Sequence, residues 1–385
     1  MTVPDAAGAT APAIAGHLER TRAYVQNAPV DALLIARPEN RRYVTGFTGS
    51  AGLALITPDA ALLAVDFRYY EQAAAQARAF RVIRGGADPA AALADALKTM
   101  SISPGGGRSA EGDAGPARVG FESEFLPYAQ VERLREQFAP AQLVALPDVD
   151  RIRWVKDDAE IAAVARATEI ADAAFARLVE ILRPGLSERE AALELEIAIR
   201  RAGGERLAFD TVLASGPRGA LPHGRATGRV MNRGEFVTVD FGAVFDGYVS
   251  DCTRTVALGA ADARQRQVYE TVLAAQLRAL EAVRPGVACR DVDAAGRAVI
   301  TAAGFGEAFG HALGHGIGLD VHEGPPVSPR SDAVLEPGMI VTIEPGIYIS
   351  GWGGVRIEDA VVVTEAGARV LGRLPKDLRE IAAGP

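Results

Sequence analysis

The sequence predicts two domains, an α/β amino-terminal domain followed by an α+β domain with an internal repeat of pseudo-twofold symmetry. Between residues 17 and 150, short apolar runs alternate with helical stretches, as in α/β domains. Further along, residues 234–242 read GEFVTVDFG and residues 338–346 read GMIVTIEPG, in the same frame. The tripeptide Arg-Pro-Gly also occurs twice, at residues 183–185 and 284–286. One helix-then-strand unit is therefore present in two copies.

Length and composition are those of an ordinary globular protein. The 385 residues suffice for two domains of ~100–200 residues each, and 49% hydrophobic residues are enough to bury sizeable cores. A net charge of −8 offers no basic surface, so neither nucleic acid nor an anionic membrane is an expected partner. No apolar run is long enough to span a membrane. Two cysteines make no disulfide framework, so we expect a reducing, cytoplasmic location.

The first domain is expected to follow a disordered tail. Residues 1–16 are rich in Ala and Pro and lack the basic start and apolar core of a signal peptide. The α/β domain then spans residues 17–150, with strands predicted at residues 32–36, 53–57, 60–65, 81–84, 118–121 and 142–146, and helices at residues 18–25, 68–79, 90–100 and 127–138. A Gly-rich, mobile loop is predicted at residues 103–116. No cluster of His, Cys or carboxylates indicates chemistry in this domain.

The second domain is assigned to residues 151–385, with a linker at residues 148–158. A long amphipathic helix is predicted at residues 159–182. Ser187 and Glu190 form the pattern of a capping box, which begins a helix that runs to residue 202. Two more helices are predicted at residues 263–283 and 290–303, and each helix pair belongs to one strand pair. With the helices outside, side chains of both repeats would converge at the seam between the strand pairs.

The first strand pair brings two aspartates together. Residues 236–241 alternate between apolar and polar side chains, so Asp240 lies on the polar face. Asp246-Gly247 tolerates the positive φ angles of a two-residue type I′ turn. A turn centred there places Thr253 opposite Asp240 and leaves Asp251 as a diagonal neighbour on the same face. Two carboxylates are therefore directed at one point.

The second repeat supplies two more carboxylates. Glu344 takes the place of Asp240 in the repeated frame, and Glu358 follows it by 14 residues, against 11 residues between Asp240 and Asp251. The longer interval contains several glycines, so the register of this second pair stays open. Four grouped carboxylates need a positive charge between them, or some of them must be protonated.

The histidines gather in the same domain. Four of the five, at positions 223, 311, 315 and 322, lie there, three of them within GHALGHGIGLDVHEG. The i, i+4 spacing of His311 and His315 is also that of two ligands on one helix face, as in zinc proteases. The four glycines at residues 310–318 argue against a helix, so we predict a strand or loop that lines a cavity. A single histidine is usually a packed or surface residue, but four beside four carboxylates indicate a functional site.

These residues resemble the signature of a known family. Asp240, Asp251, His315, Glu344 and Glu358, within VDFG, SDCTRT, GHGIGLDVHE, IEPGIY and VRIED, are similar to the ligand set of the pita-bread metallopeptidases. The amino-terminal domain and LPHG around residue 223 resemble the proline-specific branch, aminopeptidase P and prolidase. RYVTGFTGSAG at residues 42–52 and DFRYYEQA at residues 66–73 are most similar to aminopeptidase P, with prolidase next. The resemblance covers residues 17–374, and no ligand position departs from the family pattern.

The resemblance implies a creatinase-type amino-terminal domain, a pita-bread catalytic domain and two divalent metal ions per chain. The implied metal ligands are Asp240, Asp251, His315, Glu344 and Glu358. Such an oxygen-rich set favours Mn²⁺, with Co²⁺ or Zn²⁺ as alternatives. The implied catalytic residues are Glu344 as general base, with His223, His311 and His322. The implied substrate-binding residues are His223, His322, Arg356 and Tyr348, which would hold the tetrahedral oxyanion, the substrate backbone or the leaving residue.

The expected activity is that of aminopeptidase P, which releases the first residue from peptides with proline at the second position. The small side chains at residues 46–52 favour it, because they leave room for a longer peptide. Prolidase, which cuts Xaa-Pro dipeptides, is the close alternative. A creatinase-like hydrolase that works without metal and a non-catalytic pita-bread binding module are further alternatives, and both normally lack the ligand set. The family also implies a homodimer.

Overall fold

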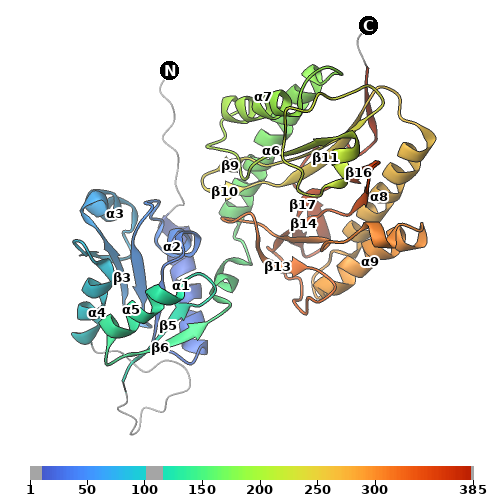
Figure 1. Ribbon diagram of the computed structural model, residues 1–385. Helices are drawn as coiled ribbons and strands as arrows, with labels where there is room; N and C mark the ends of the chain where they lie inside the picture. The colour runs from blue at the N-terminus through green and yellow to red at the C-terminus, as the bar shows by residue number, and fades with distance from the viewer. Residues whose placement is uncertain (1–10, 101–115, 383–385) are drawn as a thin grey trace. The chain divides into compact units, whose positions relative to one another are not determined.

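The computed structural model describes residues 11–100 and 116–382 (Figure 1). The chain divides into two compact units, Met1–Arg153 and Trp154–Pro385, against an expected boundary between residues 150 and 151. The tail predicted at residues 1–10 and the loop predicted at residues 103–115 lie outside the described residues. In the part of the chain that is described, no helix is both long and apolar enough to cross a membrane.

The amino-terminal unit is built on one six-stranded sheet. Its strands are β1 (Ala32–Ile35), β2 (Leu53–Ile56), β3 (Ala61–Val65), β4 (Arg81–Arg84), β5 (Arg118–Glu122) and β6 (Gln142–Leu146). They lie in the order β4-β3-β2-β1-β5-β6. Strand β2 is antiparallel to β1 and β3, and the other neighbours are parallel. All six strands agree with the predicted ones within one residue at each end, as the alternation of short apolar runs and helices requires.

The helices of this unit are α1 (Ala11–Asn27), α2 (Pro38–Thr45), α3 (Tyr70–Gln76), α4 (Pro89–Lys98) and α5 (Tyr128–Phe138), with a 3₁₀ turn η1 (Phe67–Tyr69) before α3. Helix α1 starts at Ala11, so the prediction of a tail is wrong for residues 11–16. Burial of Ile14 stabilises this turn, and composition does not reveal such a tertiary contact. Helix α2 was not predicted, because Pro38 reads as a helix breaker. It stands at the first helical position, where proline is tolerated.

The second unit contains two largely antiparallel sheets. The four-stranded sheet has the order β19-β11-β8-β7 and consists of β7 (Val212–Ser215), β8 (Phe236–Phe241), β11 (Cys252–Leu258) and β19 (Arg379–Ile381). The five-stranded sheet has the order β13-β12-β14-β17-β18 and consists of β12 (Gly314–Gly316), β13 (Glu323–Val327), β14 (Ile340–Ile343), β17 (Asp359–Thr364) and β18 (Gly367–Val370). Two short hairpins pair β9 (Val244–Phe245) with β10 (Tyr248–Val249), and β15 (Gly346–Ile349) with β16 (Gly353–Arg356).

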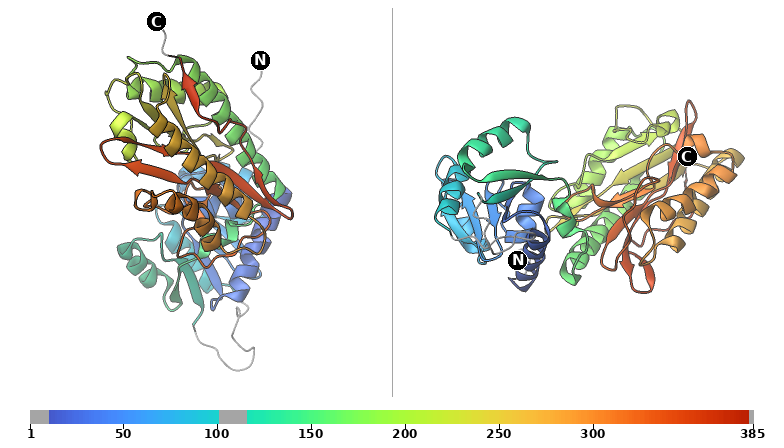
Figure 2. Two further views of the ribbon diagram at one scale, coloured as in Figure 1. Left: turned by 90° about the vertical axis from the view of Figure 1, so that its right-hand side faces the viewer. Right: turned by 90° about the horizontal axis from the view of Figure 1, so that it is seen from below.

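One helix pair covers the strands of each repeat. Helices α6 (Asp158–Ile181) and α7 (Glu188–Arg201) share a core with β7, β8 and β11, and helices α8 (Ala263–Ala282) and α9 (Cys289–Ala302) share a core with β14 and β17. Figures 1 and 2 show both pairs on the outside of the strands of this unit. In the first core, Phe175 of α6 stacks on Phe241 of β8 with ring centroids 5.1 Å apart. The arrangement confirms the predicted repeat, and the capping box at Ser187 and Glu190 begins α7 as predicted.

The first hairpin has the register that its turn predicts. Asp240 of β8 pairs with Thr253 of β11, and Phe245 pairs with Tyr248. At the turn Asp246-Gly247, φ is 47° and then 72°, which are the left-handed values of a type I′ turn. The side chain of Asp240 therefore faces the second repeat together with its strand neighbours.

The second hairpin, whose register the sequence left open, has a longer connection. Ile343 of β14 pairs with Asp359 of β17. Glu344 directly follows Ile343, and Glu358 directly precedes Asp359, so the two glutamates lie at the same end of the sheet. The glycine-containing segment between them folds into the hairpin β15–β16. Both repeats therefore bring two carboxylates to the end of a strand pair.

Candidate active site and metal centre

A cavity of about 560 Å³ in the second unit is lined by residues of both repeats. Nine of the ten predicted site residues line it, namely Asp240, Asp251, His315, Glu344, Glu358, His223, His311, His322 and Arg356. The tenth, Tyr348, hydrogen-bonds to two of these residues. The lining also includes Phe209, Asp210, Val212, Pro222 and Arg225, which sequence analysis did not select. The fold thus gathers in one cavity the side chains that two distant stretches of sequence supply.

Strand ends position the five predicted metal ligands. Asp240 lies in β8, Asp251 directly precedes β11, and His315 lies in β12. Ligand atoms of Asp251, His315 and Glu358 all lie within 4.8 Å of one another. Nε2 of His315 is 3.3 Å from Oε1 of Glu344 and 3.7 Å from Oδ2 of Asp251. The imidazole therefore stands between carboxylates from the two repeats.

The carboxylates are too close together to ionise at the same time without a cation. Burial raises the pKa of Asp251 and of Glu358 well above the ordinary values, and neighbouring carboxylates raise both further. Burial also raises the pKa of Asp240. Burial acts in the same direction on Glu344, but the hydrogen bond from His315 and its charge bring the pKa of Glu344 below its ordinary value. Divalent cations would offset this repulsion, so the donor set fits a metal centre.

Two ligand atoms can be available to a metal. Nδ1 of His315 lies 3.1 Å from the carbonyl oxygen of Gly316. Donation of the Nδ1 proton to that carbonyl leaves the lone pair of Nε2 available for a metal. Oδ1 of Asp240 is buried and has no hydrogen-bond partner. A buried acceptor without a partner costs free energy, and ligation of a cation would remove that cost.

Threonine hydroxyl groups orient two of the carboxylates. Oγ1 of Thr253 donates to Oε2 of Glu358 at 2.6 Å, and Oγ1 of Thr342 donates to Oε1 of Glu344 at 3.1 Å. Each threonine lies in a strand, β11 or β14, so its position is set by the sheet. Partners of this kind fix the direction in which a ligand presents its lone pairs.

Arg356 is surrounded by acceptors of the protein itself. Its guanidinium group donates to Oδ2 of Asp240 at 2.7 Å and to Oγ1 of Thr253 at 2.9 Å. It also donates to the hydroxyl group of Tyr348 at 2.8 Å and to the carbonyl oxygen of Pro222 at 3.1 Å. The side chain is 4% exposed, and all three guanidinium nitrogens have a protein partner. This geometry favours a role in orienting Asp240 over the substrate contact that the family resemblance implies.

Tyr348 connects Arg356 to His311. Its hydroxyl oxygen lies 2.9 Å from Nε2 of His311, and Nδ1 of His311 lies 2.7 Å from the carbonyl oxygen of Ala312. Burial lowers the pKa of His311 and raises the pKa of Tyr348 to about 12. A neutral His311 that donates from Nδ1 accepts the phenolic proton at Nε2. The chain of hydrogen bonds thus runs from Asp240 to His311.

The remaining two histidines also border the cavity. The ring centroids of His322 and His315 are 4.2 Å apart, and burial, with the charge of His315, lowers the pKa of His322. His223 lies in the loop between the 3₁₀ turn η3 (Gly216–Ala220) and β8. His315 itself lies on a strand, as the glycines predicted. A Cβ atom at Gly314 would lie 1.9 Å from a carbonyl oxygen of β14, so this strand needs glycine for close pairing.

Comparison with known proteins identifies the family. Residues 162–365 match the model described as metallopeptidase family M24, and residues 17–155 match the creatinase/prolidase amino-terminal domain. The chain belongs to metallopeptidase family M24. The M24 match contains both repeats and all five ligand positions. It confirms the predicted pita-bread domain, and the second match confirms the creatinase-type amino-terminal domain.

Relatives of this M24 peptidase match it over nearly their whole length. An Xaa-Pro dipeptidase of Pyrococcus horikoshii is 38% identical over 93% of this chain and 96% of its own. The solved structure of an Xaa-Pro dipeptidase from Bacillus anthracis is 41% identical, covers 95% of this chain and 99% of its own, and has a TM-score of 0.89. The solved structure of an X-Pro aminopeptidase from Thermotoga maritima is 37% identical, covers 94% of this chain and 100% of its own, and has a TM-score of 0.83.

A buried glutamate of the M24 peptidase holds the loop that carries His223. Glu188, the first residue of α7, is fully buried. It accepts hydrogen bonds from the backbone N–H and the hydroxyl group of Ser215, both at 2.9 Å. It also accepts from the N–H and hydroxyl of Thr227, at 3.0 and 2.7 Å, and forms an ion pair with Arg218. These bonds tie together Ser215 and Thr227, which lie on either side of His223 in the sequence.

A second buried acid holds the segment that carries His311. Asp293 of α9 forms an ion pair with Arg297, 2.7 Å apart, and accepts from the N–H of Leu313 at 3.0 Å. Arg297 donates to the carbonyl oxygens of His311 at 2.8 Å and Phe309 at 3.0 Å. Sequence analysis missed both anchoring acids, because each contacts its loop at a distance in sequence that periodicity cannot reveal.

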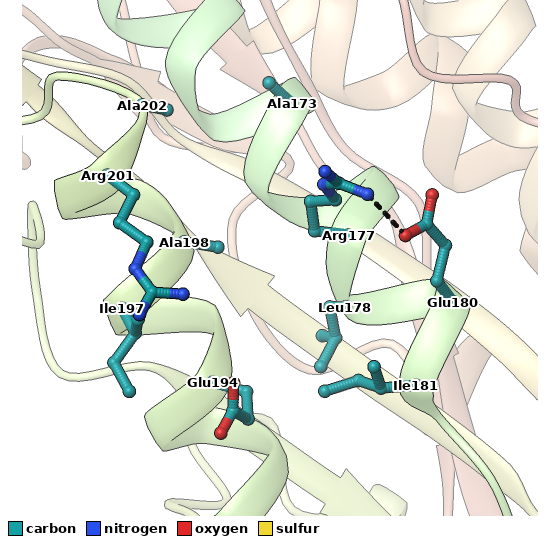
Figure 3. A pocket seen from close by; sticks show the side chains of 10 residues that line it. All are labelled: Ala173, Arg177, Leu178, Glu180, Ile181, Glu194, Ile197, Ala198, Arg201 and Ala202. Carbon is teal, nitrogen blue, oxygen red and sulfur yellow. Dashed lines mark hydrogen bonds and ion pairs between the residues drawn. The ribbon is translucent and has the colours of Figure 1, made fainter.

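A second hollow of the M24 domain, between α6 and α7, has different chemistry (Figure 3). Leu178, Ile181 and Ala198 contribute apolar surface, and Arg177 pairs with Glu180 at its edge, 2.8 Å apart. No histidine or cysteine occurs among its lining residues, all of which are described. The predicted catalytic residues line the other cavity.

Proposed function

We propose that this M24 peptidase is a metal-dependent Xaa-Pro dipeptidase, a prolidase. The observation that carries the proposal is the convergence of Asp251, His315 and Glu358 within 4.8 Å, beside Glu344, in one cavity. The names of relatives that match nearly the whole chain support the substrate class, since two of the three compared are Xaa-Pro dipeptidases. Sequence analysis favoured aminopeptidase P and placed prolidase second. The comparisons support the second alternative better.

Aminopeptidase P remains the second candidate. The X-Pro aminopeptidase of Thermotoga maritima matches 94% of this chain at 37% identity, which is close to the figure for the dipeptidases. Both activities break the bond before proline, and they differ in whether proline ends the substrate or is joined to a further residue. The choice between them depends on how the cavity treats a free carboxylate.

The five ligand residues fit two divalent ions. Four carboxylates and one imidazole carry more negative charge than a single divalent ion neutralises. Oxygen-rich ligation favours Mn²⁺, with Co²⁺ and Zn²⁺ as alternatives. When bound, such a pair supplies an activated water and polarises the carbonyl group of the substrate. The binding residues would be Asp240, Asp251, His315, Glu344 and Glu358.

Different side chains of the cavity would transfer the proton and bind the substrate. Glu344, whose pKa is lowered, is ionised at neutral pH and accepts the proton of the attacking water. His311 lines the cavity, and a hydrogen bond from the substrate backbone to its Nε2 would replace the present contact with the hydroxyl group of Tyr348. His322 lines the cavity and would stabilise the negative oxygen that develops at the carbonyl group. His223 also lines the cavity and would contact the leaving residue.

Arg356 and Tyr348 act through their neighbours. Arg356 keeps Oδ2 of Asp240 occupied at 2.7 Å and so leaves Oδ1 for the metal centre. Tyr348 transmits the position of Arg356 to His311 through two hydrogen bonds. Neither a creatinase-like hydrolase without metal nor a non-catalytic module would need this arrangement, because neither requires Asp240 to be held as a ligand.

A comparison of two substrates tests the proposal. Values of kcat/KM for Ala-Pro and Ala-Pro-Ala are measured on chelator-treated protein after titration with Mn²⁺. A prolidase cuts Ala-Pro at least tenfold faster, a difference of about 1.4 kcal/mol in transition-state binding. The reverse preference would establish aminopeptidase P instead. Failure to cut either peptide with bound metal would support the non-catalytic module.

A further inference from the structure

The floor of the active-site cavity carries a row of side chains that ends in an arginine. Asp240 of β8 pairs with Val212 of β7, and Val212 pairs in turn with Arg225 through an antiparallel bridge. Residues directly opposite each other on neighbouring strands point to the same face. All three line the cavity. A ligand carboxylate, an apolar side chain and a cation therefore follow one another on one face.

The length of this row suits a dipeptide. Neighbouring strands lie ~4.8 Å apart, so the backbones of Asp240 and Arg225 are separated by roughly 10 Å. That interval must hold both of these side chains and the substrate between them. In a dipeptide, the carboxylate follows the scissile carbonyl group by one residue, about 3.8 Å of chain. A substrate with its scissile carbonyl group beside Asp240 thus extends its carboxylate across Val212 toward Arg225.

Arg225 can exchange its ionic partner. Its side chain is 77% exposed and pairs with Asp210, itself 74% exposed, at 3.2 Å. Solvent screens such a pair, so its rupture costs little free energy. The lining residues of the cavity, all of them described, include one other arginine, Arg356, and no lysine. Because Arg356 is occupied by Asp240 and Tyr348, Arg225 is the arginine of this lining that is available to an incoming carboxylate.

The backbone of Arg225 is held in place while its side chain is exposed. Arg218 donates to the carbonyl oxygen of Arg225 at 2.8 Å and pairs with the buried carboxylate of Glu188. The bridge to Val212 holds the same residue from the side of the sheet. With its backbone held, the side chain of Arg225 can offer a guanidinium group with two parallel N–H donors, which match the two oxygens of a carboxylate.

We propose that Arg225 binds the free carboxylate of the leaving residue, with Val212 beneath the proline ring. The assignment rests on the proposed dipeptidase function and gives it a physical basis. A longer peptide presents an uncharged amide at this place and forms no ion pair with Arg225. The ion pair with Arg225 therefore favours dipeptides over longer peptides, and the cavity does not need to be closed at this end.

Removal of the substrate carboxylate tests this assignment. Ala-Pro and Ala-Pro-amide share the scissile bond and differ in the terminal charge. Arg225→Gln is expected to lower the ratio of kcat/KM for Ala-Pro to that for Ala-Pro-amide at least tenfold, mainly through KM. Asp210→Asn removes the competing carboxylate and is expected to lower KM for Ala-Pro. Arg177→Gln, which breaks the exposed pair with Glu180 on α6, serves as the control and is expected to leave the ratio unchanged.

The outcomes separate the two proposals. Suppose that the wild-type protein prefers Ala-Pro to Ala-Pro-Ala, but Arg225→Gln does not change the ratio of kcat/KM for Ala-Pro to that for Ala-Pro-amide. This result would overturn the role of Arg225 and would leave the dipeptidase function supported. Equal losses of kcat/KM for Ala-Pro and Ala-Pro-amide in Arg225→Gln would overturn the proposed contact and mean that Arg225 has only a structural role. A wild-type protein that prefers Ala-Pro-Ala would overturn the dipeptidase function, and the assignment of Arg225 with it.

Discussion

Equivalent residues of the two repeats have acquired different electrostatic surroundings. Asp240 and Glu344 occupy the same place in the repeated frame, yet Asp240 faces Arg356 and Glu344 faces His315. Burial raises the pKa of Asp240, whereas the contact with His315 outweighs burial and lowers the pKa of Glu344. The difference makes Glu344 the better candidate for the general base, because it is ionised at the pH at which a water must be deprotonated.

Glu344→Gln tests this role. The substitution removes the base and one ligand charge while it keeps the size of the side chain, so kcat is expected to fall by at least about 10²-fold. The melting temperature is expected to stay close to that of the wild-type protein, since the other four ligands remain. Steady-state kinetics on Ala-Pro with Mn²⁺ measure the effect. Glu365→Gln, at an exposed position in the turn between β17 and β18, is the control, and wild-type turnover in Glu344→Gln would mean that another group activates the water.

At the scale of elements, each of the two repeats holds its histidine-carrying loop with a buried acidic side chain. The second helix of each repeat contributes a buried acid, Glu188 on α7 and Asp293 on α9, which accepts a hydrogen bond from a backbone N–H group of a loop further along the chain. The loops that carry His223 and His311 are thereby attached to helices, which hold the two histidines in defined positions. The precision of the site thus depends on residues that lie outside the cavity lining.

Arg297→Met tests the anchor on α9. The change removes the donors to two carbonyl oxygens and leaves Asp293 without its ionic partner, so a loss of about 1–3 kcal/mol in unfolding free energy is expected. Urea unfolding followed by tryptophan fluorescence measures it, because both tryptophans, Trp154 and Trp352, lie in the second unit. Arg278→Met on α8, which breaks the exposed pair with Glu281, is the matched control and should change stability by less than about 1 kcal/mol. Equal losses in the two variants would contradict the anchoring role.

The raised pKa of Asp172 in α6 predicts that this residue makes a pH-dependent contribution to stability. Burial raises its pKa above the ordinary value, in spite of the hydrogen bond from the N–H of Arg373 at 2.6 Å. A raised folded-state pKa means that this group favours folding most below its unfolded-state pKa, and that the contribution is lost as the pH rises through the folded-state pKa. Asp172→Asn is therefore expected to gain stability over the wild-type protein at pH 7, and the gain should shrink toward pH 4.

Urea unfolding of the wild-type protein and Asp172→Asn at pH 4, 5.5 and 7 provides the measurement. Groups common to both proteins cancel in the difference, so the remaining pH dependence belongs to Asp172. An exposed aspartate, Asp377, replaced by Asn gives the control. A difference between Asp172→Asn and wild type that does not vary with pH would show that the carboxyl group titrates normally.

At the scale of the whole molecule, the chemistry resides in the second unit. The cavity, the five ligand positions and both anchoring acids lie between residues 154 and 385, and the M24 match falls within the same limits. The amino-terminal unit has its own sheet and core and corresponds to a separate family model. The homodimer implied by the family stays a prediction, as does the use of the amino-terminal unit to form it.

Metal content is a property of the whole chain that can be measured directly. We expect chelator-treated protein to lose its peptidase activity and to regain it with Mn²⁺, at a stoichiometry of two ions per chain by elemental analysis. Binding should also raise the melting temperature, because ions that bind the folded state alone stabilise it by mass action. Full activity of the stripped protein would refute a metal-dependent mechanism, and one ion per chain would leave at least one of the five ligand assignments without support.

Much of this architecture follows from local patterns in the sequence. The type I′ turn at Asp246-Gly247 determines that Thr253 faces Asp240, because a two-residue turn leaves one register. The repeated frame likewise predicts Glu344 and Glu358 as a second pair. Glycines around His315 argue against a helix and predict a strand or loop, and the structure has the strand β12 there. Each of these inferences depends on backbone geometry within a few residues, which the residue types specify.

Tertiary structure decided the features that depend on contacts between distant segments. The burial of Ile14 extends α1 beyond the composition-based limit, and the acids Glu188 and Asp293 reach loops that no periodic pattern connects to them. The isolated bridge between Arg225 and Val212 of β7, which pairs in turn with Asp240 of β8, has no local signature. The sequence by itself therefore determined the family and the first hairpin, and it predicted the ligand residues. The packing of distant segments determined that Arg356 is enclosed by protein partners while Arg225 is exposed, because both depend on groups supplied by the whole fold.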